Sequence, residues 1–162
     1  MDGRWGGIFT VSDGLPFTAL ISGDPAGEKN SFAYDTPNRV VGPACTHLTN
    51  PGNPNGYINL SCFSFPVPAN LFGNAGRNSL VGPGLAELDF SIMRNFRVPL
   101  SESGRLQFRA EAFNLANRAN FQGPVSNNSL YNASGAPLAT AGVITSTATT
   151  SRQIQLALRL LW

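Results

Sequence analysis

The chain ends with the stretch Arg152-Gln-Ile-Gln-Leu-Ala-Leu-Arg-Leu-Leu-Trp162, in which apolar residues recur at every second position. Successive side chains of a β-strand point to opposite faces of a sheet, so this alternation predicts a strand with one apolar face. The residues of that face are Ile154, Leu156, Leu158, Leu160 and Trp162. We therefore expect an amphipathic strand over residues 151–162 that ends in an aromatic side chain.

Two further segments, near residues 85–98 and 105–117, show the same alternation. Their apolar positions include Leu88, Phe90, Ile92, Leu106 and Phe108, and their polar positions include Glu87, Asp89, Arg109 and Glu111. The residues between the segments, Pro99-Leu-Ser-Glu-Ser-Gly104, hold the Pro and Gly of a tight turn. The pattern therefore predicts a β-hairpin.

A helix over residues 105–119 is the competing interpretation of the second segment, because these residues are rich in Ala, Leu, Glu and Arg. A strand is favoured because the alternation holds without interruption over residues 105–112 and is shared by the neighbouring segment.

A fourth and weaker strand is expected near residues 4–20, where Trp5, Phe9 and Val11 lie on one side before a kink at Gly14. The remaining segments, 22–84 and 118–150, are crowded with Asn, Pro, Gly, Ser and Thr and are expected to be long loops. Loops of this length are uncommon inside compact soluble domains, but they are normal on the outer side of membrane barrels.

The order of strands and connections fits one placement in a membrane. If the short turn at residues 99–104 is periplasmic, both long loops lie outside the cell. The expected fold class is all-β, with antiparallel strands from the C-terminal part of a transmembrane β-barrel, about four long strands and two long loops. Four strands cannot close a barrel, because the smallest known has about eight, so an incomplete barrel cut from a longer exported protein is expected.

This placement assigns each strand face to an environment. The residues expected to face lipid are Leu88, Phe90, Ile92, Leu106 and Phe108, and those expected to face the lumen are Glu87, Asp89, Arg109 and Glu111.

Composition argues against several other functions. The formal net charge is +2, from 11 basic and 9 acidic residues without a Lys/Arg run, so nucleic acid is not an expected partner. The first residues, Met1-Asp-Gly-Arg-Trp-Gly-Gly7, lack the basic and apolar regions of a signal peptide. The sole histidine, His47, could act as a catalytic base, but the sequence contains no Gly-x-Ser-x-Gly motif to provide a nucleophile. No enzymatic activity and no cofactor are therefore expected.

Cys45 and Cys62 are the only cysteines, and their spacing suits a loop-closing disulfide in an oxidising compartment. Two unpaired thiols are the alternative. The two cysteine thiols and His47 would together offer three zinc ligands. The sequence lacks the paired C-x-x-C units typical of zinc sites and indicates no fourth ligand, so no metal site is expected.

Several short motifs lie along the predicted strands and their approaches. They are Gly14-Leu-Pro-Phe-Thr18, Phe72-Gly-Asn-Ala-Gly-Arg-Asn-Ser-Leu-Val-Gly-Pro-Gly-Leu85, Leu88-Asp-Phe-Ser-Ile92, Asn95-Phe96, Leu106-Gln-Phe-Arg-Ala-Glu-Ala-Phe-Asn114, Asn120-Phe121 and Arg152-Gln-Ile-Gln-Leu156. Together they resemble the C-terminal end of Oar-like TonB-dependent receptors. The resemblance covers nearly all of the chain.

The resemblance implies a barrel of about 22 strands with an N-terminal plug, which imports or binds large or scarce ligands and is energised through TonB. The chain has no counterpart to the plug, the TonB box or an export signal. Its implied partners are therefore outer-membrane lipid, the remainder of the barrel and plug, and TonB through the missing N-terminal part. The closing strand resembles the signal that the barrel-assembly machinery reads, which implies this role for Ile154, Leu156, Leu158, Leu160 and Trp162.

The main hypothesis is thus that the chain is part of a TonB-dependent transporter or receptor in the bacterial outer membrane. The alternatives are a secreted or surface β-protein used for adhesion or binding, and a non-functional gene fragment.

Overall fold

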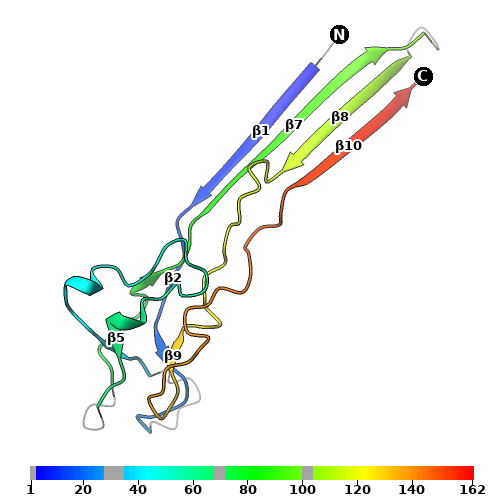
Figure 1. Cartoon of the computed structure of the whole chain (residues 1–162). Coiled ribbons are helices and arrows are strands. Elements are labelled where there is room, and N and C mark those ends of the chain that lie inside the picture. Colours follow the sequence, from blue (N-terminus) through cyan, green and yellow to red (C-terminus); the bar gives the residue numbers. More distant parts are fainter. Residues whose placement is uncertain (1–2, 28–34, 68–71, 100–103) are drawn as a thin grey trace. The chain divides into compact units, whose positions relative to one another are not determined.

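The computed structural model describes residues 3–27, 35–67, 72–99 and 104–162, and its regular structure is almost entirely β (Figure 1). Four strands are long: β1 (Gly3–Ser12), β7 (Leu85–Arg97), β8 (Arg105–Phe113) and β10 (Gln153–Leu161). Across the described ranges, no helix has the length and apolar character needed to cross a membrane.

The four long strands form one sheet in the order β1-β7-β8-β10, and each neighbouring pair is antiparallel (Figure 1). Strands β1 and β10 are the two edges, so the sheet is open. The predicted fold class, an antiparallel all-β sheet from an incomplete barrel, is confirmed.

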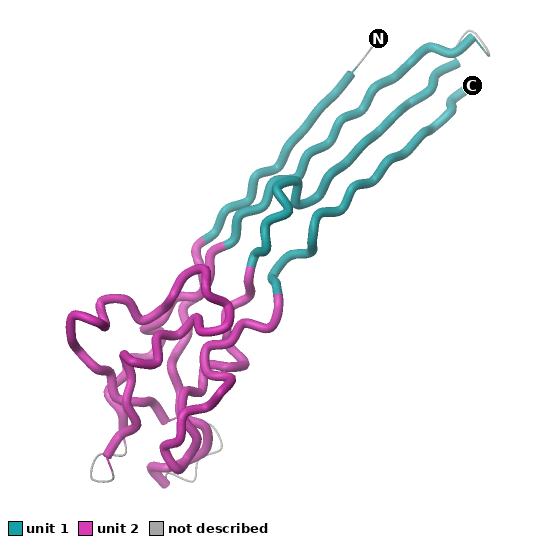
Figure 2. The backbone as a smooth tube through the Cα atoms, viewed as in Figure 1, with its two compact units in different colours: residues 1–12, 85–120, 147–162 teal, residues 13–84, 121–146 magenta. Residues whose placement is uncertain are grey.

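The chain divides into two compact units (Figure 2). Unit 1 contains the four-stranded sheet and comprises residues 1–12, 85–120 and 147–162. Unit 2 comprises residues 13–84 and 121–146, which correspond largely to the two segments expected to be loops.

Unit 2 is built from short elements. These are β2 (Pro16–Phe17), β3 (Leu20–Ile21), β4 (Asn38–Arg39), the 3-10 turns η1 (Pro43–Cys45) and η2 (Leu60–Cys62), β5 (Phe63–Ser64), β6 (Leu80–Val81) and β9 (Ser129–Tyr131). Strand β2 pairs with β6 and β4 with β5 in antiparallel fashion, whereas β3 pairs with β9 in parallel.

Unit 2 has its own hydrophobic core, to which both segments contribute. Its buried residues are Phe17, Ala19, Ile21, Cys45, Tyr57, Ile58, Cys62, Phe63, Ala75, Leu80, Leu130, Tyr131, Ala141 and Ile144. The sequence analysis expected two long loops here and did not predict this shared core. Short apolar runs separated by Pro, Gly and Asn pack together here without forming long strands.

The strand expected near residues 4–20 ends earlier, at Ser12. Beyond it, Phe17, Ala19 and Ile21 turn into the core of unit 2. The change of direction occurs at Gly14, where a Cβ atom would overlap the carbonyl oxygen of Gly82. Only glycine permits this close approach of two backbone segments.

The strand expected near residues 105–117 ends at Phe113, and the competing helix over residues 105–119 does not form. Asn114 and Asn117 have φ angles of 48° and 49°, which end the extended conformation. In the predicted turn, the Val98 N–H donates to the carbonyl oxygen of Gly104 at 3.1 Å, while residues 100–103 lie outside the described ranges.

Candidate functional sites: the amphipathic sheet and the disulfide-bonded unit

The pairing register brings the alternating apolar positions identified in the sequence to one side of the sheet, whereas other apolar residues, such as Ile8 and Met93, lie on the opposite side. Phe9 pairs with Leu88, Ile92 pairs with Ala110, and Ala110 in turn pairs with Leu156. Cross-strand partners lie on the same side of a sheet. We call this side the apolar face; it comprises Gly3, Trp5, Gly7, Phe9, Val11, Ala86, Leu88, Phe90, Ile92, Arg94, Phe96, Leu106, Phe108, Ala110, Ala112, Ile154, Leu156, Leu158 and Leu160.

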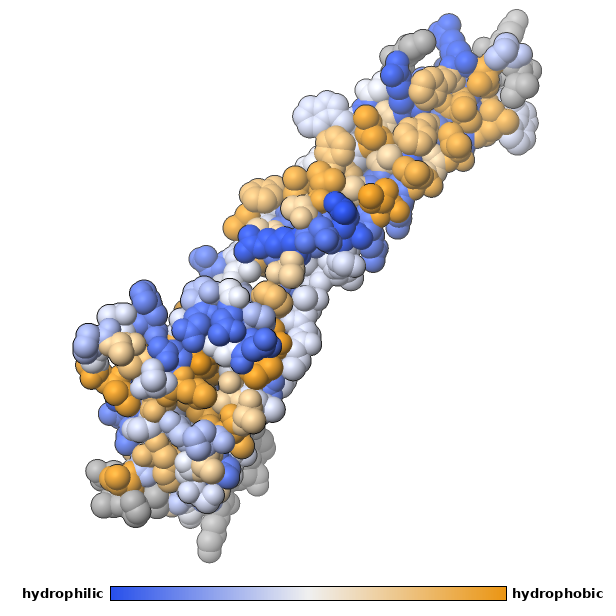
Figure 3. All heavy atoms as spheres, in the orientation of Figure 1, coloured by the Kyte–Doolittle hydropathy of each residue, from blue (hydrophilic) through white to orange (hydrophobic). Residues whose placement is uncertain are grey.

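Much of the apolar face is exposed. Trp5 is 79% exposed, Phe9 70% and Leu156 70%, although residues of this kind are normally buried. Figure 3 shows apolar side chains gathered along the strands. An exposed apolar surface that runs across a whole sheet marks a face that meets another apolar medium or partner.

The opposite side of the sheet, the polar face, carries all four residues expected in the lumen. They are Glu87, Asp89, Arg109 and Glu111, and their positions follow from the same register. Three contacts among the described residues involve charged or amide side chains of this face. The Asn114 N–H donates to Asp89 Oδ1 at 2.9 Å, and two further contacts join pairs of side chains. Arg109 Nη2 lies 2.6 Å from Glu111 Oε1, and Gln107 Nε2 donates to Asn95 Oδ1 at 3.0 Å.

Three asparagines stabilise the connection between β8 and β10 within unit 1. Asn114 is fully buried; its Nδ2 donates to the carbonyl oxygens of Arg118 and Thr150, both at 3.0 Å, and its Oδ1 accepts from the Arg118 N–H at 3.0 Å. Asn117 Oδ1 accepts from the N–H of Arg152, just before β10. The side chains therefore replace strand hydrogen bonds where the chain leaves the sheet.

Asn120 makes a similar link to β7. Its Oδ1 accepts from the Ala86 N–H at 3.0 Å, and its Nδ2 donates to Thr149 Oγ1 at 3.0 Å. Alternation does not reveal these residues, because Asn114 and Asn117 fall inside the strand expected near residues 105–117 and Asn120 lies just beyond it. The available signal is the tolerance of asparagine for positive φ and its ability to hydrogen-bond backbone groups.

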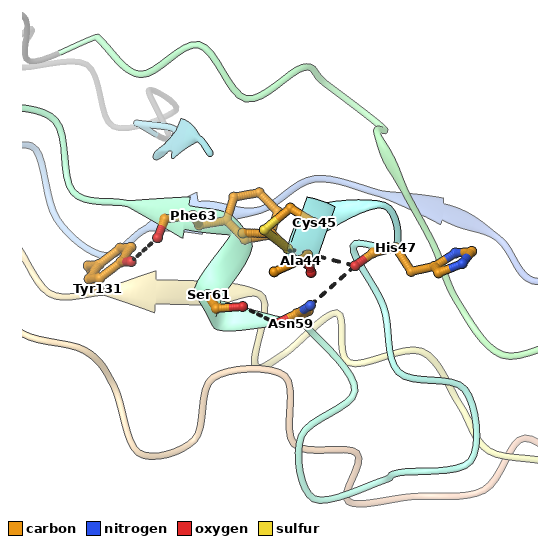
Figure 4. The surroundings of a disulfide bond; sticks show 8 residues. Ala44, Cys45, His47, Asn59, Ser61, Phe63 and Tyr131 are labelled. Atoms are coloured by element: carbon orange, nitrogen blue, oxygen red, sulfur yellow. Dashed lines mark hydrogen bonds between the residues drawn. A yellow bond between two sulfur atoms is a disulfide. The ribbon is translucent and has the colours of Figure 1, made fainter. Parts of the chain in front are cut away.

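Cys45 and Cys62 are joined in a disulfide that links η1 to η2 in unit 2 (Figure 4). Both residues are buried, and their Cα atoms are 5.2 Å apart. The sulfurs are bonded to each other, so they are not available as thiolate ligands beside the exposed His47. Within the described ranges, no cluster of three His, Cys, Asp or Glu side chains is placed to hold a metal ion.

Two buried tyrosines support the same core. The Tyr131 hydroxyl donates to the carbonyl oxygen of Phe63 at 2.8 Å, and the Tyr57 hydroxyl donates to that of Val81 at 2.9 Å (Figure 4 shows the former). Burial raises the pKa of both phenols above 10.0, and for Tyr57 a smaller opposing effect comes from a hydrogen bond with Thr49.

The fold therefore belongs to the class of β-proteins with an open antiparallel sheet that has one exposed apolar face. A family model described as an outer membrane beta barrel domain matches residues 4–155. The chain belongs to this family and is an outer-membrane β-barrel protein. The family is typically non-enzymatic. No curated protein and no solved structure matches the chain.

Proposed function

We propose that the chain is part of a TonB-dependent transporter or receptor of the outer membrane, in which the four long strands form part of the barrel wall. The observation that supports this most strongly is the continuity of the apolar face over β1, β7, β8 and β10. A continuous apolar face is unfavourable when it is exposed to water, but it is favourable when it contacts the hydrocarbon of a bilayer.

In this proposal Leu88, Phe90, Ile92, Leu106 and Phe108 face lipid. Glu87, Asp89, Arg109 and Glu111 face the wet lumen, because a charge turned toward the middle of the bilayer costs about 2–4 kcal/mol. Among described residues, Arg94 is the one charged side chain on the apolar face. It lies three residues from the end of β7, with its guanidinium 5.3 Å from the centre of the Phe96 ring. A long side chain near a strand end can direct its charge to the membrane surface.

The open edges support the participation of further strands. Backbone groups at the edges of β1 and β10 have no partner strand among the residues described. Unpaired backbone groups in hydrocarbon cost several kcal/mol each, so every edge must be paired in a membrane. The remainder of the barrel would supply the neighbouring strands.

Unit 2 would form the ligand-facing surface outside the cell. Its two segments join strand ends opposite the short turn at residues 99–104, and long connections of barrels lie on the outer side. The Cys45–Cys62 disulfide is consistent with exposure to an oxidising compartment. The resemblance to Oar-like receptors is what favours TonB-dependent import over other barrel functions.

The orientation of the faces can be tested with a matched pair of single cysteines on β10. Leu156→Cys lies on the apolar face and Gln155→Cys on the polar face, and the two native cysteines are already bonded. Each variant is made in the complete barrel, which supplies partner strands for β1 and β10, and is labelled with a small fluorophore. The labelled barrel is then reconstituted in vesicles that contain doxyl-labelled lipid. We expect lipid quenching to be strong at position 156 and weak at 155; equal quenching at both would refute the lipid-facing assignment.

The closing strand is proposed as the signal for the barrel-assembly machinery, through Ile154, Leu156, Leu158, Leu160 and Trp162. Deleting Trp162, which is 84% exposed, removes no contact of a protein core. In the full-length parent we expect the deletion to reduce the amount of assembled protein in the outer membrane. Unchanged outer-membrane levels would contradict this role.

TonB dependence is tested separately, at the level of the gene. An in-frame upstream sequence that encodes further alternating strands and a plug would support the transporter. A signal peptide that directly adjoins Met1 would favour the secreted or surface binding protein instead.

A further inference from the structure

The polar face changes charge along the length of the sheet. Glu87, Asp89 and Glu111 lie in the half of the sheet away from the short turn. Arg97, Arg105 and Arg159 lie in the half beside it. The turn-side half of the polar face holds no carboxylate among the residues that the structure describes.

The three arginines are neighbours in the sheet. Arg97 and Arg105 are direct cross-strand partners on β7 and β8, and Arg105 is diagonal to Arg159, because Arg159 pairs with Gln107 on β10. Direct partners have Cβ atoms about 5 Å apart and diagonal ones about 7–8 Å, so three guanidinium groups can converge on one point. We call these three residues the arginine cluster.

The cluster differs from the nearby Arg109, whose charge is balanced by Glu111 at 2.6 Å. Arg97, Arg105 and Arg159 are exposed and form no ion pair with any described residue. Like charges placed directly opposite each other destabilise a sheet. An anion held between them would remove this repulsion and gain charge-assisted hydrogen bonds.

We propose that the arginine cluster binds a small multivalent oxyanion, such as a pyrophosphate-bearing or polycarboxylate solute. Guanidinium groups recognise phosphate and carboxylate oxygens with paired N–H donors. The Asn95–Gln107 pair adjoins the cluster on the same face, and Asn95 Nδ2 is a further donor there.

The position of the cluster distinguishes this ligand from a lipid phosphate. Side chains on the polar face point away from the side that would contact lipid, so a headgroup would instead meet the apolar face. The small area over which the three charges converge matches one compact ion better than an extended acidic peptide. The inference rests on the proposed function in one respect, namely that water reaches the polar face.

The test uses the full chain in nonionic detergent, after circular dichroism has verified its β-structure, and calorimetric titration with pyrophosphate at 0.15 M salt. We expect one pyrophosphate to bind per chain and Arg105→Gln to weaken binding at least tenfold. Arg105→Lys should retain part of the affinity, because it keeps the charge but loses the paired donors. Arg159→Gln, on the exposed edge strand, is a second variant that leaves the centre of the sheet unchanged.

The matched control is Arg4→Gln, which removes the same charge from the same face. Arg4 pairs with Met93, about 14 Å along the strand from Arg97, which is beyond the screening length of about 8 Å. We expect this variant to bind within twofold of the unmodified chain. Equal losses for Arg4→Gln and Arg105→Gln would overturn the site, as would tighter binding of a polyglutamate peptide than of pyrophosphate.

Absence of pyrophosphate binding by a chain with verified β-structure would also overturn the site. That result would leave the barrel proposal intact if position 156 is still quenched by lipid. Failure of the barrel proposal is recognised separately, by equal lipid quenching at positions 155 and 156.

Discussion

Replacing Asn114 by alanine should destabilise unit 1 more than its small change in volume suggests. The substitution removes three side-chain hydrogen bonds from a fully buried position. At about 1 kcal/mol each, they contribute roughly 3 kcal/mol. Alanine also disfavours the φ of 48° by about 1 kcal/mol, so we expect a total loss of about 4 kcal/mol.

Asn114→Gly separates the two contributions, because glycine adopts positive φ without a steric penalty but makes no side-chain hydrogen bond. We expect it to cost about 3 kcal/mol, less than alanine. Asn95→Ala is the control: it removes one hydrogen bond on the polar face and should cost about 1 kcal/mol.

Urea unfolding in detergent micelles, followed by tryptophan fluorescence, measures these differences in unfolding free energy. Both tryptophans, Trp5 and Trp162, belong to unit 1, so the signal reports on the sheet. A loss below about 1 kcal/mol for Asn114→Ala would refute the view that this side chain holds the β8–β10 connection in place.

Other predictions concern unit 2 and the strand faces. Replacing Cys45 and Cys62 by alanine should destabilise unit 2 by about 3 kcal/mol, measured by denaturant unfolding and tyrosine near-ultraviolet circular dichroism. The pKa of Tyr131 is raised on folding, so the stabilisation from its neutral form is complete below pH 10 and is lost as pH rises above 10. A stability of unit 2 that increases with pH in that range would contradict this. Leu156→Arg should reduce barrel stability in vesicles by about 2–4 kcal/mol if this residue lies near mid-bilayer, whereas Gln155→Arg should change it by less than about 1 kcal/mol.

Alternation was sufficient to predict the four long strands, because a side-chain period of two survives in the sequence wherever one face meets an apolar medium. Aligning the apolar faces restricts the register only to steps of two residues. The particular pairs, such as Leu88 with Phe9 and Ala110 with Leu156, come from the structure. Alternation could not reveal where the strands end. Those ends depend on Gly14 and Asn114, whose roles arise from contacts with residues distant in the sequence.

The core of unit 2 was not predicted, because its buried residues occur singly or in short runs without a period. Phe17, Ile21 and Leu130 join one core through the pairing of β2 with β6 and of β3 with β9. No local sequence pattern predicts these pairings. The one specific contact that the sequence predicted within this region is the Cys45–Cys62 disulfide, with two free thiols as the alternative.

Because the two long segments share the core of unit 2, a change in one segment affects the packing of the other. Tyr131 of the second segment donates to the backbone of Phe63 in the first, and the Ile144 N–H donates to the carbonyl oxygen of Pro54 at 2.7 Å. If one segment alone were grafted onto another barrel, its core residues would lose the partners that the other segment provides and would be exposed. Engineering new recognition on such a scaffold therefore requires grafting both segments as a pair, or confining changes to the exposed side chains between the anchors.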